Sequence, residues 1–380
     1  MFGAILLIFF IILIGYFHFQ RLEMYKLTTH IPGPVSYPII GSSYLFFNKS
    51  CEQVFEQLQK LLAQFHSPAK IWFGPILALL IDDPDDLQVV LNSNDCLEKS
   101  FVYNFFGCEM GLFSCPAKIW KIHRKLLNNC FSLKIMQKYL PIMNDKSRIF
   151  TKLLEEEIGR GEFDIHEYST RCTLDITFAT NFQLDLDTQR NEWGKVFVRE
   201  FSKLTEAISE RIFSIFHHPT FIYKWTGWGQ QDRKSRLVFD EAAKIVIKNN
   251  VKHPDAQIDQ NIHDSMPYIT KLLRLKEVYP KIFTDKAIKD EIDTLVVGGN
   301  ETTGLTIAFT LLMLAMHPEI QEKVFQEIIL NDTGEMDPSI DVLSQLNFME
   351  MVIKETLRHF PVGPVIGRKA TANVPLGKFL

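Results

Sequence analysis

One stretch of the sequence limits the possible folds more than any other: "DTLVVGGNETTGLTIAFTLLMLAM", Asp293 to Met316. Thr284 can cap the start of a helix and the next proline is Pro318, so the pattern predicts one helix of about 50 Å. A helix this long and apolar is expected to run through the middle of the protein. Its centre nevertheless holds "GGNETTG", whose poor helix formers cost roughly 3–4 kcal/mol. That cost predicts a function for the interrupted turn.

The spacing within this turn suggests what the function is. Gly298 and Gly299 lie four and three residues before Thr302, so all three are expected on one helix face, with a flat patch beside a hydroxyl. The Thr302 hydroxyl can bond a carbonyl one turn back and bend the helix. Glu301 adds an ionisable group. The motif is compatible with proton delivery beside a planar cofactor, and equally with a close helix crossing next to a solvated glutamate.

The composition predicts a globular, mainly α protein with small β-sheets. The 380 residues are 46% hydrophobic and 23% charged, with a net charge of −4 and no long basic run, so no nucleic-acid partner is expected. The segment "KIWFGPILALLI" predicts a hairpin that turns at Gly74-Pro75. Asp83 followed by Pro84 predicts the start of a helix.

The N-terminus predicts a membrane anchor. Residues 2–19 contain no Lys, Arg, Asp or Glu, and as a helix they would span about 27 Å, close to the apolar thickness of the endoplasmic-reticulum membrane. A cleaved signal peptide would require a basic start and a small-residue cleavage site, and neither is present. We therefore expect a signal-anchor at 1–20. Arg21 and Lys26 flank it and favour a cytosolic body.

The next segment, 21–42, is expected to be a linker rich in proline and glycine. It contains "IPGPVSYPIIGS", which cannot form a helix or a central strand. Residues 43–380 are then the remaining domain. Within it, the unusually aromatic stretch at 210–229 has two interpretations, core packing or a substrate entrance that dips into the membrane surface.

The six cysteines show no C-x-x-C spacing, and all of them precede residue 173. We expect reduced thiols and neither disulfides nor a metal site built from protein side chains.

Two further helical patterns hold pairs of polar side chains. In "WKIHRK", Trp120 and Arg124 lie four residues apart, and their N–H groups suit the carboxylates of a buried ligand. In "KETLRHFPVGPVIGR", Glu355 and Arg358 lie three residues apart and favour an ion pair. An extended run then presents Arg368. Each pair alone is a weak signal. A core Trp with a surface Arg would also give the first pattern, and Glu157 and Arg160 show the spacing of the second elsewhere in the chain.

The order of these motifs resembles the cytochrome P450 superfamily of haem-thiolate monooxygenases. "GGNETT", then "KETLR" and "FPVGPVIGR", after an anchor, a proline-rich linker and "WKIHR", follow the order of that family. "IAFTLLMLAMHPEIQEKVFQEI" and "HRKLLNNCFS" are similar to the microsomal family 4 branch, which includes fatty-acid ω-hydroxylases.

The resemblance implies a cytochrome P450 fold and a site for haem. Glu301 and Thr302 would be the acid–alcohol pair that relays protons, with Gly298 and Gly299 beside the cofactor. Trp120, Arg124 and Arg368 would hold the haem propionates, and Glu355 with Arg358 would be a buried structural pair.

The resemblance also implies an activity and its partners. The enzyme would insert one oxygen atom of O2 into a lipophilic substrate, such as a fatty acid, an endogenous lipid or a xenobiotic. Electrons would come from NADPH through a reductase, with cytochrome b5 as a further partner. The protein would be single-pass in the endoplasmic-reticulum membrane.

Two features depart from the family pattern. Many members of the branch carry Glu at the position of Gly298, so a covalent link to haem is not expected here. The loop that carries the family's cysteine ligand lies well beyond the E-x-x-R helix, whereas residue 380 is 25 positions after Glu355. We expect the fold to be incomplete at the C-terminus and this chain to be inactive alone. The two remaining interpretations are a fragment of an oxygenase and a catalytically dead, membrane-anchored protein.

Overall fold

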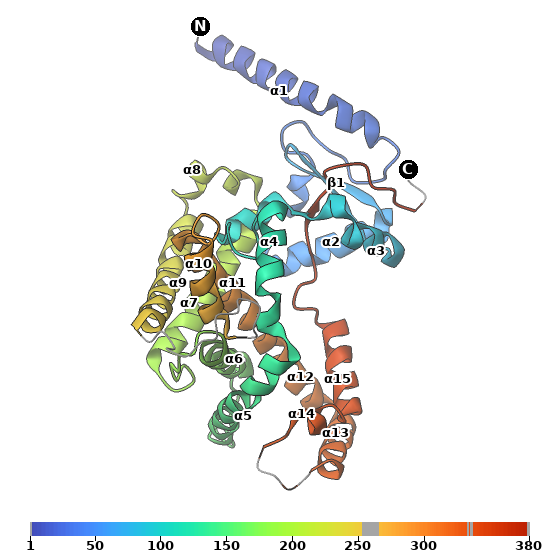
Figure 1. Cartoon of the computed structure of the whole chain (residues 1–380). Helices are drawn as coiled ribbons and strands as arrows, with labels where there is room; N and C mark the ends of the chain where they lie inside the picture. The colour runs from blue at the N-terminus through green and yellow to red at the C-terminus, as the bar shows by residue number, and fades with distance from the viewer. Residues whose placement is uncertain (1, 253–265, 333, 335–336, 378–380) are drawn as a thin grey trace. The chain divides into compact units, whose positions relative to one another are not determined.

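The computed structural model describes residues 2–252, 266–332, 334 and 337–377. The chain is mainly α-helical with two small antiparallel sheets, which confirms the predicted class (Figure 1). It divides into two compact units. Unit 1 comprises residues 1–105, 203–235 and 368–380, and unit 2 comprises residues 106–202 and 236–367. The outer limits of the predicted segments, residue 1 and residues 378–380, lie outside the described residues.

Unit 1 combines the two sheets with helices that range from three to 26 residues in length. Its elements are α1 (Phe2–Leu27), η1 (Ser43–Phe46), α2 (Cys51–Phe65), β1 (Ala69–Phe73), β2 (Ile76–Leu80), α3 (Pro84–Asn92), η2 (Asn94–Cys96), β3 (Glu98–Lys99), η3 (Phe101–Phe106), η5 (Ile215–His217), α8 (Thr220–Tyr223) and β4 (Arg368–Lys369).

Local sequence signals in unit 1 produce the expected elements. β1 and β2 pair antiparallel with Phe73 opposite Ile76, so the predicted hairpin is confirmed. Gly74 at its turn has φ +55°, a conformation that favours glycine. The Asp83 side chain accepts hydrogen bonds from the first amides of α3, as predicted. A small apolar core lies beneath, built from α2, η1 and β1: Phe46, Val54, Leu58, Leu61 and Ile71.

Unit 2 is built from helices. Its elements are α4 (Ala117–Leu127), η4 (Asn128–Phe131), α5 (Leu133–Glu155), α6 (Ile165–Asn181), α10 (Tyr268–Val278), α11 (Asp285–Gly299), α12 (Glu301–Met316), α13 (Pro318–Leu330), α14 (Ile340–Leu343) and α15 (Asn347–His359). Two long helices contribute residues to both units: α7 (Glu192–Phe213) and α9 (Gly227–Lys252).

The packing of unit 2 centres on α6, α11 and α12. α6 packs on α5, α11 and α12, while α12 also packs on α13 and α15 (Figure 1). An aromatic cluster supports this arrangement: the ring centres of Phe197 and Phe239 are 5.0 Å apart, and Phe178 meets Trp193 edge to face at 5.9 Å. Phe309 of α12 stacks on Phe360 at 4.6 Å. The long apolar segment therefore lies at the centre of the helix contacts of this unit.

Two helices bear on the question of membrane contact. α1 continues to Leu27, beyond the predicted anchor at 1–20. Among the described residues, the helical stretch Asp285–Met316 is long and apolar enough to cross a bilayer, a criterion that core helices of soluble proteins also meet. This stretch packs against α6, α13 and α15, although within α12 only Gly304 and Ala308 are buried.

Candidate active site

The predicted long helix is interrupted at a single residue. Thr284 caps its start by accepting a hydrogen bond from the Ala287 amide at 3.2 Å. α11 ends at Gly299 and α12 begins at Glu301, with Asn300 between them at φ −90° and ψ −78°. The prediction of one unbroken helix is wrong at this position. The buried Thr173 hydroxyl lies 2.9 Å from the Asn300 carbonyl and gives that group a partner outside the helix.

A row of polar side chains on α6 lies along the break between α11 and α12. We call it the α6 seam: His166, Ser169, Thr170, Thr173 and Thr177, which share one face by their spacing. The Ser169 hydroxyl donates to the Gly304 carbonyl at 2.9 Å. The α6 seam therefore contacts the backbone of α12 directly, so the two helices approach closely.

The glycines at the break have different roles. A Cβ atom on Gly299 would lie 2.8 Å from the Thr177 hydroxyl, and one on Gly304 would lie 2.8 Å from the Thr170 hydroxyl. A Cβ on Gly298 would meet nothing within 4 Å. The prediction that Gly298 and Gly299 form one flat patch is wrong, because adjacent residues of a helix point in different directions. Gly299 permits helix crossing, and Gly298 leaves an open surface.

The Thr302 hydroxyl lies on the open side of the break. It donates to the Gly298 carbonyl at 2.7 Å, which confirms the predicted bond to the preceding turn. A bond of this kind bends a helix and weakens its own ladder. The Gly298–Thr302 turn thus has an open backbone surface and a fixed hydroxyl, side by side.

Glu301 faces the α6 seam. Its Oε1 lies 3.1 Å from His166 Nε2, with the two side chains 19% and 26% exposed. The interpretation of Glu301 as a solvated side chain is therefore wrong. Its Oε2 is buried and accepts no hydrogen bond from the described residues. The bond to Glu301 raises the pKa of His166 against the opposing effect of burial.

The predicted propionate-binding residues are divided between the units. Trp120 is half-buried and Arg124 is exposed, both on α4 of unit 2. Arg368 belongs to unit 1, where it pairs with Lys99 between β4 and β3. The three roles remain predictions.

Glu355 and Arg358 form the expected ion pair, but on the surface. Two guanidinium–carboxylate bonds of 2.8 Å join them, and the side chains are 58% and 65% exposed. The pair lowers the pKa of Glu355 to about 2. The expectation of a buried pair is wrong here, because α15 turns its Thr356 face inward and leaves these two side chains on the opposite face.

The cysteines are free thiols, as expected. Cys51 is exposed and lies 3.2 Å from the Ser209 hydroxyl. The other five are buried: Cys96, Cys108, Cys115, Cys130 and Cys172. Burial raises the pKa of Cys108, Cys130 and Cys172 to about 12. A neutral buried thiol is a poor metal ligand, because the thiolate is the binding form.

A fully buried polar cluster was missed by the sequence analysis. His123 Nδ1 lies 2.7 Å from Glu291 Oε1, and both side chains are 0% exposed. The Tyr268 hydroxyl and the Leu112 amide donate to Glu291 Oε2 at 2.7 and 3.2 Å. The sequence does contain a signal for this cluster, because Glu291 follows Ile288 by three residues on the apolar face of α11. A carboxylate at such a position requires buried partners.

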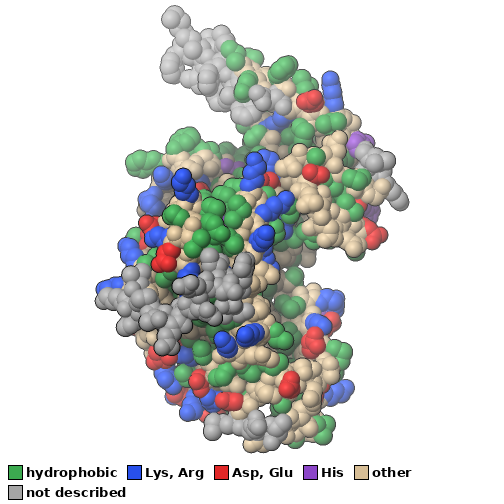
Figure 2. Space-filling model, viewed as in Figure 1, with side chains coloured by type: hydrophobic (Ala, Val, Ile, Leu, Met, Phe, Trp, Pro, Cys, Tyr) green, Lys and Arg blue, Asp and Glu red, His purple; other side chains and the backbone are tan. Residues whose placement is uncertain are grey.

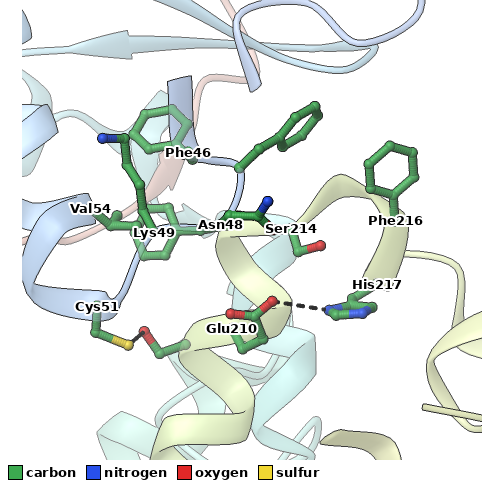
Figure 3. Close-up of a pocket in the computed structure, with 12 residues that line it drawn as sticks. Phe46, Asn48, Lys49, Cys51, Val54, Glu210, Ser214, Phe216 and His217 are labelled. Atoms are coloured by element: carbon green, nitrogen blue, oxygen red, sulfur yellow. Dashed lines mark hydrogen bonds and ion pairs between the residues drawn. The ribbon is translucent and has the colours of Figure 1, made fainter. Parts of the chain in front are cut away.

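Unit 1 has a pocket of about 360 Å³ beside the aromatic stretch (Figure 3). Phe46 and Phe213 contribute apolar walls, and Glu210 faces His217 across 3.5 Å. The stretch at 210–229 matches neither interpretation throughout. Tyr223 is buried, whereas Phe221 and Trp225 are 73% and 87% exposed. Figure 2 shows hydrophobic side chains gathered over α8.

The turn at residues 298–302 fits a planar cofactor such as haem. The surface at Gly298 is free of side chains, a hydroxyl is fixed beside it, and the unpartnered Glu301 Oε2 adds an acceptor. The buried cysteines do not fit the cofactor's thiolate ligand. We therefore assign the turn as one wall of the candidate site and assign no axial ligand.

Comparison with known sequences gives the class of protein. The cytochrome P450 family profile matches residues 31–380, so the chain belongs to the cytochrome P450 family. This is a family of haem monooxygenases.

The similar proteins include members of family 4. The chain is 28% identical to cytochrome P450 4c21 of Blattella germanica over 96% of this chain and 74% of the relative. It is 27% identical to probable cytochrome P450 313a4 of Drosophila melanogaster over 95% and 74%. It is also 27% identical to human cytochrome P450 4V2 over 89% and 67%.

Proposed function

We propose that the protein is a membrane-bound haem monooxygenase that inserts one oxygen atom of O2 into a lipophilic substrate. Fatty acids, other lipids and xenobiotics are the candidate substrates. The observation that carries the proposal is the turn at Gly298–Thr302, where an open backbone surface adjoins a fixed hydroxyl and a paired carboxylate. Haem supplies the oxidising centre, and the surrounding residues would control binding and protons.

Each predicted site residue has a role in this proposal. Gly298 would let the cofactor approach the helix backbone, and Gly299 keeps α11 against α6. Glu301 and Thr302 would pass protons, because one holds a carboxyl group and the other a hydroxyl at the same turn. Trp120, Arg124 and Arg368 would bind the propionates, since their N–H groups suit carboxylates. Glu355 and Arg358 join neighbouring turns of α15 as a surface ion pair.

The relay role is tested by Thr302→Ala in the haem-loaded enzyme. We expect haem to be retained and the ratio of product to consumed NADPH to fall, because the hydroxyl moves protons and does not hold the cofactor. Thr303→Ala is the matched control, an exposed threonine at the next position. Fully coupled turnover in Thr302→Ala would refute the relay.

Membrane attachment through α1 is the second part of the proposal. The charge-free run at its start and the exposed Phe221 and Trp225 of unit 1 favour a single-pass protein of the endoplasmic reticulum with a cytosolic body. Deleting residues 1–20 should release most of the protein on carbonate extraction of microsomes. Replacing Phe221 and Trp225 with serine should weaken attachment less. Intact protein in the soluble fraction would contradict the anchor.

Electron delivery by an NADPH-dependent reductase, with cytochrome b5 as a further donor, is the third part. Lys118, Lys121 and Lys125 are exposed along one side of α4 and suit an acidic partner; Figure 2 shows Lys and Arg side chains along this helix. Lys121→Glu should raise the KM for reductase in a salt-dependent manner. Lys323→Glu, on the exposed face of α13, is the control and should change it little.

A second candidate is a membrane-anchored protein without catalytic activity. It is favoured by the buried cysteines, because burial raises the pKa of Cys108, Cys130 and Cys172 to about 12 and a neutral thiol is a poor metal ligand. We propose that residues 1–380 expressed by themselves do not bind haem through a thiolate. The reduced carbon-monoxide difference spectrum of membranes tests this. A stable thiolate-type band would show that one of the six cysteines reaches the iron, and the second candidate would be excluded.

A further inference from the structure

The partner of Glu301 is a histidine, and its placement suggests more than a structural contact. His166 lies in the first turn of α6, where its amide donates to the Asp164 side chain at 2.9 Å. This cap fixes the backbone, and the imidazole reaches Glu301 Oε1 on α12. His166 is therefore held by one helix and delivers its ring nitrogen to the other.

The pair connects solvent with the interior of the turn. The His166 side chain is 26% exposed, Glu301 is 19% exposed, and Glu301 Oε2 is buried without a hydrogen bond from the described residues. One oxygen of the carboxylate thus contacts a partly exposed base, and the other is buried. Thr302, the next residue, carries the hydroxyl assigned to proton transfer above.

We propose that His166 is the outer member of the proton relay and supplies protons to Glu301. In each transfer the Nε2–H bond of the imidazolium breaks and an Oε1–H bond forms, so both groups become neutral. Solvent water then returns a proton to the imidazole, and Glu301 passes its proton inward. This inference rests on the proposed role of Glu301 and Thr302.

The charges around His166 suit this role. Glu301 acts on it from α12, and Asp164 and Glu167 act on it from its own segment. Three carboxylates keep the imidazole protonated to higher pH than an isolated histidine. The imidazole of His166 therefore holds its proton to higher pH than it would without these carboxylates.

The competing explanation is that His166 only clamps α6 to α12. His166→Gln separates the two, because the amide can still donate to Glu301 but cannot titrate. The product-to-NADPH ratio of the haem-loaded enzyme is measured from pH 6 to 9 together with the melting temperature. The His166 titration is followed by NMR in wild type and in Glu301→Gln.

We expect wild-type coupling to fall as pH rises through the pKa that NMR gives for His166, and that pKa to drop in Glu301→Gln. His166→Gln should keep the melting temperature, lose coupling severalfold at neutral pH and lose the pH dependence. Wild-type coupling and pH profile in His166→Gln would overturn the inference. If Thr302→Ala also stayed coupled, the proposed relay itself would fail. If Thr302→Ala uncoupled while His166→Gln did not, only the role of His166 would be wrong.

Discussion

Two histidine–glutamate pairs join the central α11–α12 helices of unit 2 to their neighbours, and their surroundings differ. His123 and Glu291 are both 0% exposed and lie among Tyr268, Phe283 and the Leu112 amide. His166 and Glu301 are 26% and 19% exposed. The same two side-chain types thus form a sealed pair and an open pair. Burial, and not residue type, decides which pair can exchange protons with solvent.

The sealed pair is expected to give the largest effect on stability. His123→Ala leaves the Glu291 carboxylate buried without its main partner, so unfolding should become easier by about 3–5 kcal/mol. Tyr268→Phe removes one hydrogen bond from the same carboxylate, and it should cost roughly 1.5–3 kcal/mol. Chemical denaturation of both variants measures this. If His123→Ala lost less stability than Tyr268→Phe, His123 would not be the main partner of Glu291.

Asp293 is an intermediate case on α11, 7% exposed and 2.6 Å from Lys289. Burial raises its pKa to about 6, despite the nearby ammonium. Because the folded-state pKa lies above the unfolded one, this group favours folding below about pH 4 and loses that contribution as pH rises through about 6. The two-unit difference corresponds to about 3 kcal/mol. The free energy of unfolding of Asp293→Asn, relative to that of wild type, should therefore increase between pH 4 and pH 7. A difference that does not change with pH would contradict the raised pKa of Asp293.

The open pair should contribute less to folding. His166→Ala is expected to cost less than about 1 kcal/mol, because solvent screens a partly exposed pair. Because folding raises the pKa of His166, the pair stabilises the folded state fully below the ordinary histidine pKa. This stabilisation is lost as pH rises through the folded-state pKa. Denaturation at pH 6 and pH 8 tests both points. A loss as large as that of His123→Ala would remove the distinction between the pairs.

The surface pair on α15 should give the smallest effect. Glu355 and Arg358 are mostly exposed, so Glu355→Ala should leave the melting temperature of residues 1–380 almost unchanged. The variant is compared with Lys354→Ala, which also breaks an exposed pair on α15. A much larger loss in Glu355→Ala would restore the prediction that this pair is structural.

The sequence predicted the features that depend on local spacing. The hairpin at Gly74-Pro75, the caps at Thr284 and Asp83 and the Thr302–Gly298 bond were predicted because each involves residues close in the chain. The different roles of Gly298 and Gly299 were not predicted, because they depend on Thr177 of another helix.

The long-range pairs escaped the sequence analysis for the same reason. His123 and Glu291 are separated by 168 positions, and His166 and Glu301 by 135. The spacing of Glu291 on an apolar face could have predicted a buried partner, but not which one. The helical spacing of Glu355 and Arg358 predicted their pairing, while their exposure depends on how α15 packs.

The difference between the two pairs is tested most directly by deuterium exchange at the imidazole Cε1–H of individual histidines, read by mass spectrometry of the folded protein. The exchange reports access of solvent to each ring within one sample. We predict measurable exchange at His166 and none at His123 until the protein unfolds. Equal exchange at the two rings would contradict the distinction between a sealed structural pair and an open pair that supplies protons.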